Sequence, residues 1–129
     1  MIEEDYVSFE TAKLLKDKGF DEFTFSNYNE NGITQFTEVE TRVGEGYQRP
    51  TLQMAMKWLR EYKKILTSIF CHIDKGYWFC IQHFIDSPYK FATSESIHRK
   101  EEILGKIQYY DTYEQACEAS IKYCLEKLI

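Results

Sequence analysis

Long apolar segments are missing from this 129-residue sequence. The longest candidate runs from Ile65 to Ile73 and is interrupted by Thr67, Ser68 and His72, whereas a membrane-spanning helix needs about 18 apolar residues in succession. The N-terminal segment MIEEDYVSFE is acidic and contains no apolar core of the kind that a secretory signal carries. We therefore expect a cytoplasmic protein that does not associate with membranes.

Proline and positive charge are also scarce, with 2 prolines and a formal net charge of −5. Aromatic residues are abundant by contrast, with 10 Tyr, 9 Phe and 2 Trp. So much aromatic surface with so little proline excludes a disordered chain, and the length predicts a single domain covering residues 1–129. The negative charge argues against general nucleic-acid binding.

The cysteines form no CxxC pair, which excludes a zinc ribbon and a thioredoxin-like motif; they are Cys71, Cys80, Cys117 and Cys124. Cys117 and Cys124 are two helical turns apart, about 10 Å along a helix, whereas a disulfide tolerates a Cα separation of roughly 7 Å. Cys80 and His83 have CxxH spacing, but residues three apart in a strand point to opposite faces. We expect reduced thiols, no metal site and no cofactor.

Helical periodicity marks three segments of the chain. Residues 8–18 follow the N-cap candidate Ser8, and residues 51–64 follow the N-cap candidate Thr51. The widest apolar stripe lies in residues 111–128. At the start of that segment, Asp111 and Glu114 have the spacing of a capping box.

A first hairpin is predicted from the alternation of apolar and polar residues, with strands near 22–28 and 33–40. Asn31-Gly32 favours a type I′ turn. The following residues 44–50 contain two glycines and a proline, which predicts a loop that exposes Tyr47 and Arg49. Residues 106–110 read as a last strand. Residues 86–105 allow either a short helix that starts at Ser94-Glu95-Ser96 or a long polar loop.

A second hairpin is predicted over residues 66–73 and 77–85, and two registers are possible. A two-residue turn would set Cys71 opposite Cys80, and a three-residue turn ending at Gly76 would set Cys71 opposite Phe79, which the position of the glycine favours. The favoured register gathers one apolar face: Ile69, Cys71, Ile73, Tyr77, Phe79 and Ile81. It leaves the other face to His72, Trp78 and Cys80.

These elements predict the α+β class. Tight turns between successive strands imply antiparallel pairing. We expect a single domain with one antiparallel sheet of about five strands, made of two hairpins and one further strand, and two to three main helices packed on one face.

No catalytic motif such as GxSxG, HExxH or a phosphate-binding glycine loop occurs, so we identify no catalytic residues and expect a protein that is not an enzyme. Binding is the remaining possibility. The helix predicted over residues 51–64 carries a basic stripe, made of Gln53, Lys57, Arg60 and Lys64, with aromatic residues at its edges. The candidate ligand or partner surface comprises Tyr47, Arg49, Gln53, Lys57, Trp58, Arg60, Lys64, His72, Tyr77 and Trp78.

Three segments also carry a resemblance. They resemble recurring sequence segments of small uncharacterised proteins from gut Bacteroidales and their phages or prophages. The three segments are PTLQMAMKWLRE at 50–61, DTYEQACEA at 111–119 and YVSFE at 6–10. The resemblance implies a mobile-element origin and a cytoplasmic setting, and it carries no activity with it.

The leading hypothesis is therefore a small, non-catalytic interaction protein of phage or mobile-element type that forms a homo-oligomer or binds a protein partner. The alternative is a module that binds an anionic small molecule such as a nucleotide through the basic stripe. A Cys/His enzyme using Cys71 or Cys80 is a third hypothesis.

Overall fold

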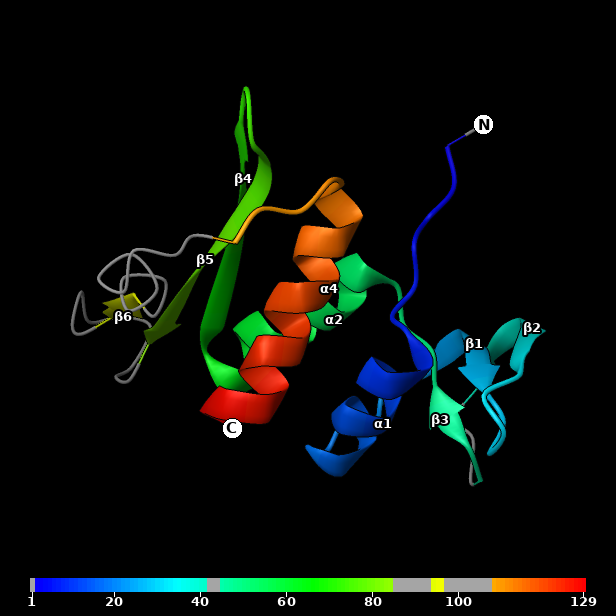
Figure 1. The fold of residues 1–129 in the computed structure, drawn as a ribbon. Helices are drawn as coiled ribbons and strands as arrows, with labels where there is room; N and C mark the ends of the chain where they lie inside the picture. Colours follow the sequence, from blue (N-terminus) through cyan, green and yellow to red (C-terminus); the bar gives the residue numbers. More distant parts are fainter. Residues whose placement is uncertain (1, 42–44, 85–93, 97–107) are drawn as a thin grey trace.

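The computed structural model describes residues 2–41, 45–84, 94–96 and 108–129, and it confirms the α+β class with antiparallel strand pairing (Figure 1). The strands form two three-stranded sheets, where the sequence suggested a single sheet.

The first sheet has the strand order β2-β1-β3 and lies next to helix α1. Its elements are α1 (Phe9–Asp17), β1 (Thr24–Tyr28), β2 (Thr34–Thr41) and β3 (Tyr47–Gln48). The predicted N-cap of α1 is confirmed, since the Ser8 hydroxyl accepts the Thr11 N–H. A bulge interrupts the β1–β2 ladder between Thr24 and Ser26. The prediction of a plain loop near residue 47 is wrong, because β3 pairs with β1 there.

The turn between β1 and β2 differs from the predicted type I′ turn. Gly32 has a positive φ of 83°, but Asn31 does not, and a type I′ turn needs a positive φ at both central residues. The Gly32 N–H donates to the Asn29 carbonyl, and the Asn29 side chain accepts the N–H groups of Asn31 and Ile33. These side-chain bonds of Asn29 stabilise a longer loop.

The second sheet has the order β4-β5-β6, and α2 and α4 pack against it. Its elements are α2 (Leu52–Lys63), β4 (Ile65–His72), β5 (Gly76–Phe84), β6 (Ser94–Ser96) and α4 (Tyr113–Tyr123), which continues as the π-helix η1 (Cys124–Leu128). Thr51 caps α2 as predicted by accepting the Met54 N–H. Lys64, with φ of 57°, adopts the left-handed conformation that ends α2 and directs the chain into β4.

Neither predicted register of the second hairpin is correct. The structure pairs Cys71 with Tyr77 and His72 with Gly76, two residues away from the favoured register. Gly76 has a φ of 108°, and an added Cβ would lie 2.5 Å from the Tyr110 carbonyl oxygen. A shift of two residues keeps the faces, so Phe79 and Ile81 are buried as predicted. The turn now contains Ile73, which is 93% exposed instead of facing the core.

Two predictions near the C-terminus also need correction. The capping box of α4 is made by Thr112 and Gln115, one residue later than predicted, because the Thr112 hydroxyl accepts the Gln115 N–H. Ser94–Ser96 forms a strand paired with β5 and not the start of a helix. The rest of 86–105 and the start of the predicted strand 106–110 lie outside the described residues, and Tyr110 forms an isolated bridge with Tyr77.

One hydrophobic cluster joins both halves of the molecule. It contains Val7, Ala12, Leu15, Phe20, Tyr28, Leu52, Ala55, Met56, Trp58, Leu59, Ile65, Phe79, Ile81, Cys117, Ile121, Cys124 and Leu125. The N-terminal segment runs between the two halves, and it forms one wall of the surface described next (Figure 1).

Candidate functional site

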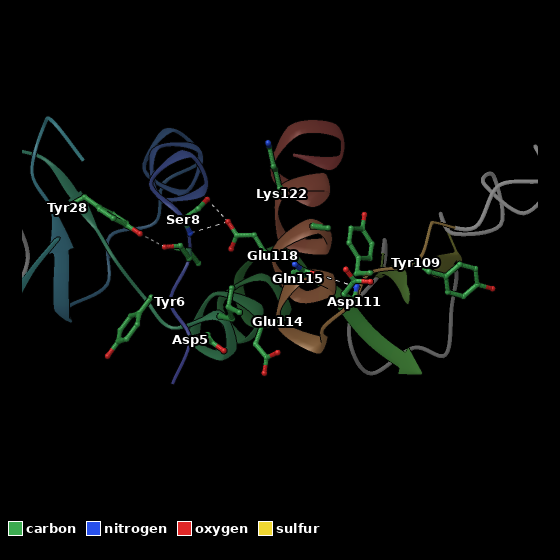
Figure 2. Close-up of a pocket in the computed structure, with 14 residues that line it drawn as sticks. Asp5, Tyr6, Ser8, Tyr28, Tyr109, Asp111, Glu114, Gln115, Glu118 and Lys122 are labelled. Atoms are coloured by element: carbon green, nitrogen blue, oxygen red, sulfur yellow. Dashed lines mark hydrogen bonds between the residues drawn. The ribbon is translucent and has the colours of Figure 1, made fainter. Parts of the chain in front are cut away.

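A groove of about 730 Å³ lies between the N-terminal segment and α4 (Figure 2). Residues 5–8, Tyr28 and Leu52 line one side, and residues 109–111 and the α4 face from Glu114 to Lys122 line the other. Its volume falls within the range of roughly 300–1,000 Å³ that is typical of ligand sites.

Backbone hydrogen bonds hold the N-terminal wall in place. The Val7 N–H donates to the Pro50 carbonyl (3.1 Å), and the Leu52 N–H donates to the Asp5 carbonyl (2.9 Å). The Tyr28 hydroxyl, itself buried, donates to the Val7 carbonyl (2.6 Å). The wall is thus anchored to both β1 and the start of α2.

Glu118 joins the two walls at the base of the groove. Its Oε1 atom accepts the Ser8 N–H (3.1 Å), the Ser8 hydroxyl (2.5 Å) and the Thr11 hydroxyl (2.5 Å). A carboxylate at this position also complements the positive end of the α1 dipole. Its Oε2 atom is buried and has no hydrogen-bond partner among the described residues. We conclude that Glu118 positions α1 against α4.

The charge of the groove is predominantly negative. Four lining residues carry carboxylates, namely Asp5, Asp111, Glu114 and Glu118. The lining also includes one lysine, Lys122, whose Nζ lies 2.9 Å from Glu10 and 4.0 Å from Glu126. The hydrogen bond to Glu10 raises the pKa of Lys122 above its ordinary value. Because acidic partners already surround Lys122, the groove favours a cation over an anion.

Tyrosines supply the aromatic part of the lining, namely Tyr6, Tyr28, Tyr109 and Tyr110. The guanidinium carbon of Arg49 lies 4.2 Å from the Tyr6 ring centroid and 5.4 Å from that of Tyr28. Arg49 also donates to the Ser26 hydroxyl (3.0 Å). Arg49 therefore already makes a cation–π contact with Tyr6 and Tyr28, although it is not itself a lining residue.

None of the ten residues of the predicted surface lines the groove. Tyr47 packs edge-on against Phe9 (5.5 Å between ring centroids) and is half-buried, as is Arg49; the expectation that both are exposed is wrong. Trp58 is buried against Phe20 (5.4 Å between ring centroids). The aromatic side chains next to the basic stripe therefore serve mainly to pack the molecule.

The basic stripe itself is exposed along α2 and its end, at Gln53, Lys57, Arg60 and Lys64. Lys57 lies 3.9 Å from Glu61, and Lys64 donates to the Glu61 carbonyl (3.2 Å). A depression of about 240 Å³ beside the stripe includes both Glu22 and Glu61. The charge of Glu22 raises the pKa of the neighbouring Tyr62. The stripe therefore lies among acidic groups.

The predicted hairpin residues form separate local contacts. Trp78 stacks on Phe70 with ring centroids 4.6 Å apart, and the Tyr77 ring meets Tyr113 edge-on at 6.3 Å. The His72 ring accepts the backbone N–H of Asp74 (3.2 Å).

Two of the four thiols, those of Cys117 and Cys124, are buried. Burial raises the pKa of Cys117 to about 11 and that of Cys124 to about 12, so both remain protonated at neutral pH. Cys71 is exposed and donates to the carbonyl of His72, not to its ring. In the described part of the chain, His, Cys, Asp and Glu side chains form no group of three suited to a metal ion.

The groove was missed because it combines residues from opposite ends of the sequence. Spacing along a chain does not show that residues 5–8 meet residues 109–122. Only local features of the sequence pointed to residues of the groove. They are the N-cap position of Ser8 and the presence of Glu118 on a helix with a wide apolar stripe.

Comparison with protein-family models, curated proteins and solved structures finds no match to this chain. Within the ranges that the structure describes, no helix combines the length and apolar character needed to cross a bilayer.

Proposed function

We propose that this protein is a non-catalytic interaction protein whose groove holds a positively charged, extended segment of a protein partner. The observation that carries the proposal is the lining of the groove of about 730 Å³, in which three exposed carboxylates, those of Asp5, Asp111 and Glu114, lie among four tyrosines. Carboxylates pair with Lys and Arg side chains, and tyrosine rings attract the same cations through their faces.

The proposed setting follows the sequence resemblance. On this proposal the protein is of phage or mobile-element origin and acts in the cytoplasm. An anchored N-terminal wall supports a binding role, because a preformed site loses little conformational entropy when a ligand enters.

The experiment measures fluorescence anisotropy of a fluorescein-labelled hexa-arginine peptide, with a hexa-glutamate peptide as the negative probe. The test variant combines Asp5→Asn with Glu114→Gln, two exposed lining residues whose carboxylates take no part in the contacts that hold the walls. The matched control combines Glu30→Gln with Asp74→Asn, two exposed acids outside the groove. Both variants remove the same net charge.

We expect the groove variant to bind hexa-arginine about tenfold more weakly than the control variant, a difference of about 1.4 kcal/mol. Binding should also weaken with added salt, because exposed charges are screened. Equal binding by the two variants would show that only diffuse charge attracts the peptide, and the proposal would then be wrong.

A second candidate function, binding of an anionic small molecule, is supported by the exposure of Lys57 and Arg60 on one helix. Calorimetric titration with ATP tests it. The variant Lys57→Glu with Arg60→Glu should abolish any heat of binding seen with the unmodified protein, and retained binding would exclude the basic stripe.

A further inference from the structure

The asparagines of this chain all lie in β1 or in the turn that follows it, at positions 27, 29 and 31. They differ in exposure and in the residue that comes next. Asn27 is 4% exposed and precedes Tyr28, whereas Asn31 is exposed and precedes Gly32. Asn31 also lines an open depression of about 330 Å³, so water has access to it. Asn31 is therefore the asparagine most open to chemical attack.

An asparagine that precedes glycine loses its amide group without the help of an enzyme. The backbone nitrogen of the glycine gives up its proton and attacks the Cγ atom of the asparagine, so that a C–N bond forms, the bond to the amide nitrogen breaks and ammonia leaves. Water then opens the resulting succinimide ring at either carbonyl. The products are aspartate and isoaspartate, in which the backbone runs through the β-carbon. Glycine favours the attack because it carries no side chain beside the attacking nitrogen.

The fold requires glycine at position 32. Gly32 has a φ of 83°, which L residues with a side chain rarely adopt, and an added Cβ would lie 2.9 Å from the Cδ2 atom of the Phe9 ring. A larger residue at this position would therefore be strained. It follows that the reactive Asn31-Gly32 pair is part of the turn that the fold needs.

Hydrogen bonds to Asn29 restrain the reacting groups within residues 29–33, the Asn29 loop. The Gly32 N–H donates to the Asn29 carbonyl (3.0 Å), and the Asn29 Oδ1 atom accepts the N–H groups of Asn31 (2.8 Å) and Ile33 (3.0 Å). The attacking nitrogen must release its proton, so its bond to the Asn29 carbonyl has to break before the ring closes. Local opening of the loop therefore limits the rate of the reaction.

We propose that Asn31 is a modification site, where the chain deamidates spontaneously to aspartate and isoaspartate at a rate set by the opening of the Asn29 loop. The new carboxylate adds negative charge to a depression that Glu30 and Glu45 already line. Isoaspartate also lengthens the backbone of the turn by its β-carbon. The site is independent of the groove, because the Asn29 loop contributes no residue to the groove lining.

The first test follows the purified, unmodified protein by peptide mass spectrometry during incubation at neutral pH. Trypsin cleaves after Lys18 and Arg42, so all three asparagines share one peptide, and fragmentation assigns the change in mass to one of them. Asn31 should change first, and an isoaspartyl methyltransferase should label the incubated protein but neither the fresh protein nor an incubated Asn31→Gln variant. The fresh sample corrects for changes during digestion. An intact Asn31, or earlier loss at Asn27 or Asn29, overturns the proposal.

The second test determines whether the loop sets the rate. Asn29→Ala removes the side-chain acceptor of two N–H groups and should deamidate about tenfold faster at Asn31, since each such bond shifts an opening equilibrium severalfold. The matched control Asn29→Asp keeps the acceptor oxygens and should retain the unmodified rate. Circular dichroism checks that both variants are folded.

A comparison that needs no variant uses the unmodified chain in guanidinium chloride, where the hydrogen bonds of the loop are absent. Asn31 should deamidate faster there than in the folded protein under otherwise equal conditions. Equal rates in the unfolded and the folded chain, or in folded Asn29→Ala and the unmodified protein, contradict control by the Asn29 loop.

Discussion

The two sheets, β4-β5-β6 and β2-β1-β3, bury different kinds of side chain. In β4-β5-β6, the second sheet, Ile65 and Ile81 belong to the same apolar cluster as Leu59 of α2 and Ile121 of α4. In β2-β1-β3, the first sheet, most buried residues are polar, namely Thr24, Ser26, Asn27 and Gln48, with Tyr28 as the apolar exception. Both sheets are three-stranded and antiparallel, so strand pairing alone does not determine what stabilises them.

The polar side chains of the first sheet are bonded to one another and to the backbone. The Gln48 amide donates to the Glu22 carbonyl (3.0 Å) and to the Thr24 hydroxyl (2.8 Å), and the Thr24 hydroxyl donates to the Ser26 carbonyl (2.6 Å). Such a network depends on having every donor in place. An apolar layer depends instead on filled volume. The two sheets should therefore respond to different substitutions.

The largest effect is expected in the apolar layer, from Leu59→Ala. Leu59 is fully buried, and removing its side chain leaves a cavity that costs about 2–5 kcal/mol of unfolding free energy. Urea denaturation measures the change. Ile73→Ala, at a position that is 93% exposed, is the control and should cost less than about 0.5 kcal/mol. Comparable losses in both variants would contradict the assignment of the core.

An intermediate effect is expected in the polar sheet, from Gln48→Glu. The new carboxylate has nearly the same shape but cannot donate to the Glu22 carbonyl, and the Thr24 hydroxyl already donates elsewhere. Leaving these buried groups unsatisfied should cost about 1–3 kcal/mol. The control Gln35→Glu alters an exposed glutamine on β2 and should be nearly neutral. If Gln48→Glu is as stable as the unmodified protein, the hydrogen-bond network does not stabilise this sheet.

The smallest effect, and one of opposite sign, is expected from Thr67→Val. Thr67 is buried in β4, and its hydroxyl has no hydrogen-bond partner among the residues that the structure describes. Valine has the same shape without the polar atom, so the unfolding free energy should rise by about 1 kcal/mol. Ser26→Ala, which removes a bonded hydroxyl from the polar sheet, should lower stability instead. A loss of stability in Thr67→Val would show that its hydroxyl is satisfied in solution.

Features set by local sequence were predictable. Ser8 and Thr51 cap their helices because a hydroxyl reaches the backbone N–H three residues later. The capping box of α4 was predicted one residue too early, because Asp111–Glu114 and Thr112–Gln115 both have the spacing of a capping box. Periodicity identifies such elements but does not separate two candidates that fit it equally well.

Features set by distant contacts were not predictable. Alternation fixed the buried face of the second hairpin, but a shift of two residues leaves that face unchanged, so it could not fix the register. In the observed register the backbone of Tyr110, 34 positions later, packs against Gly76 and exchanges two hydrogen bonds with Tyr77. Likewise, the groove depends on Glu118 meeting Ser8, a contact for which no spacing rule exists.

The bond between Ser8 and Glu118 has a consequence for biosynthesis. The two residues are separated by 110 positions, so α1 leaves the ribosome long before its partner helix has been translated. At about 5–20 residues per second, the delay is roughly 5–20 s. During that time the Ser8 end of α1 must rely on solvent or on other proteins. The groove is therefore among the last parts of the molecule to form, and a partner that recognises it binds only chains whose translation has passed Glu118.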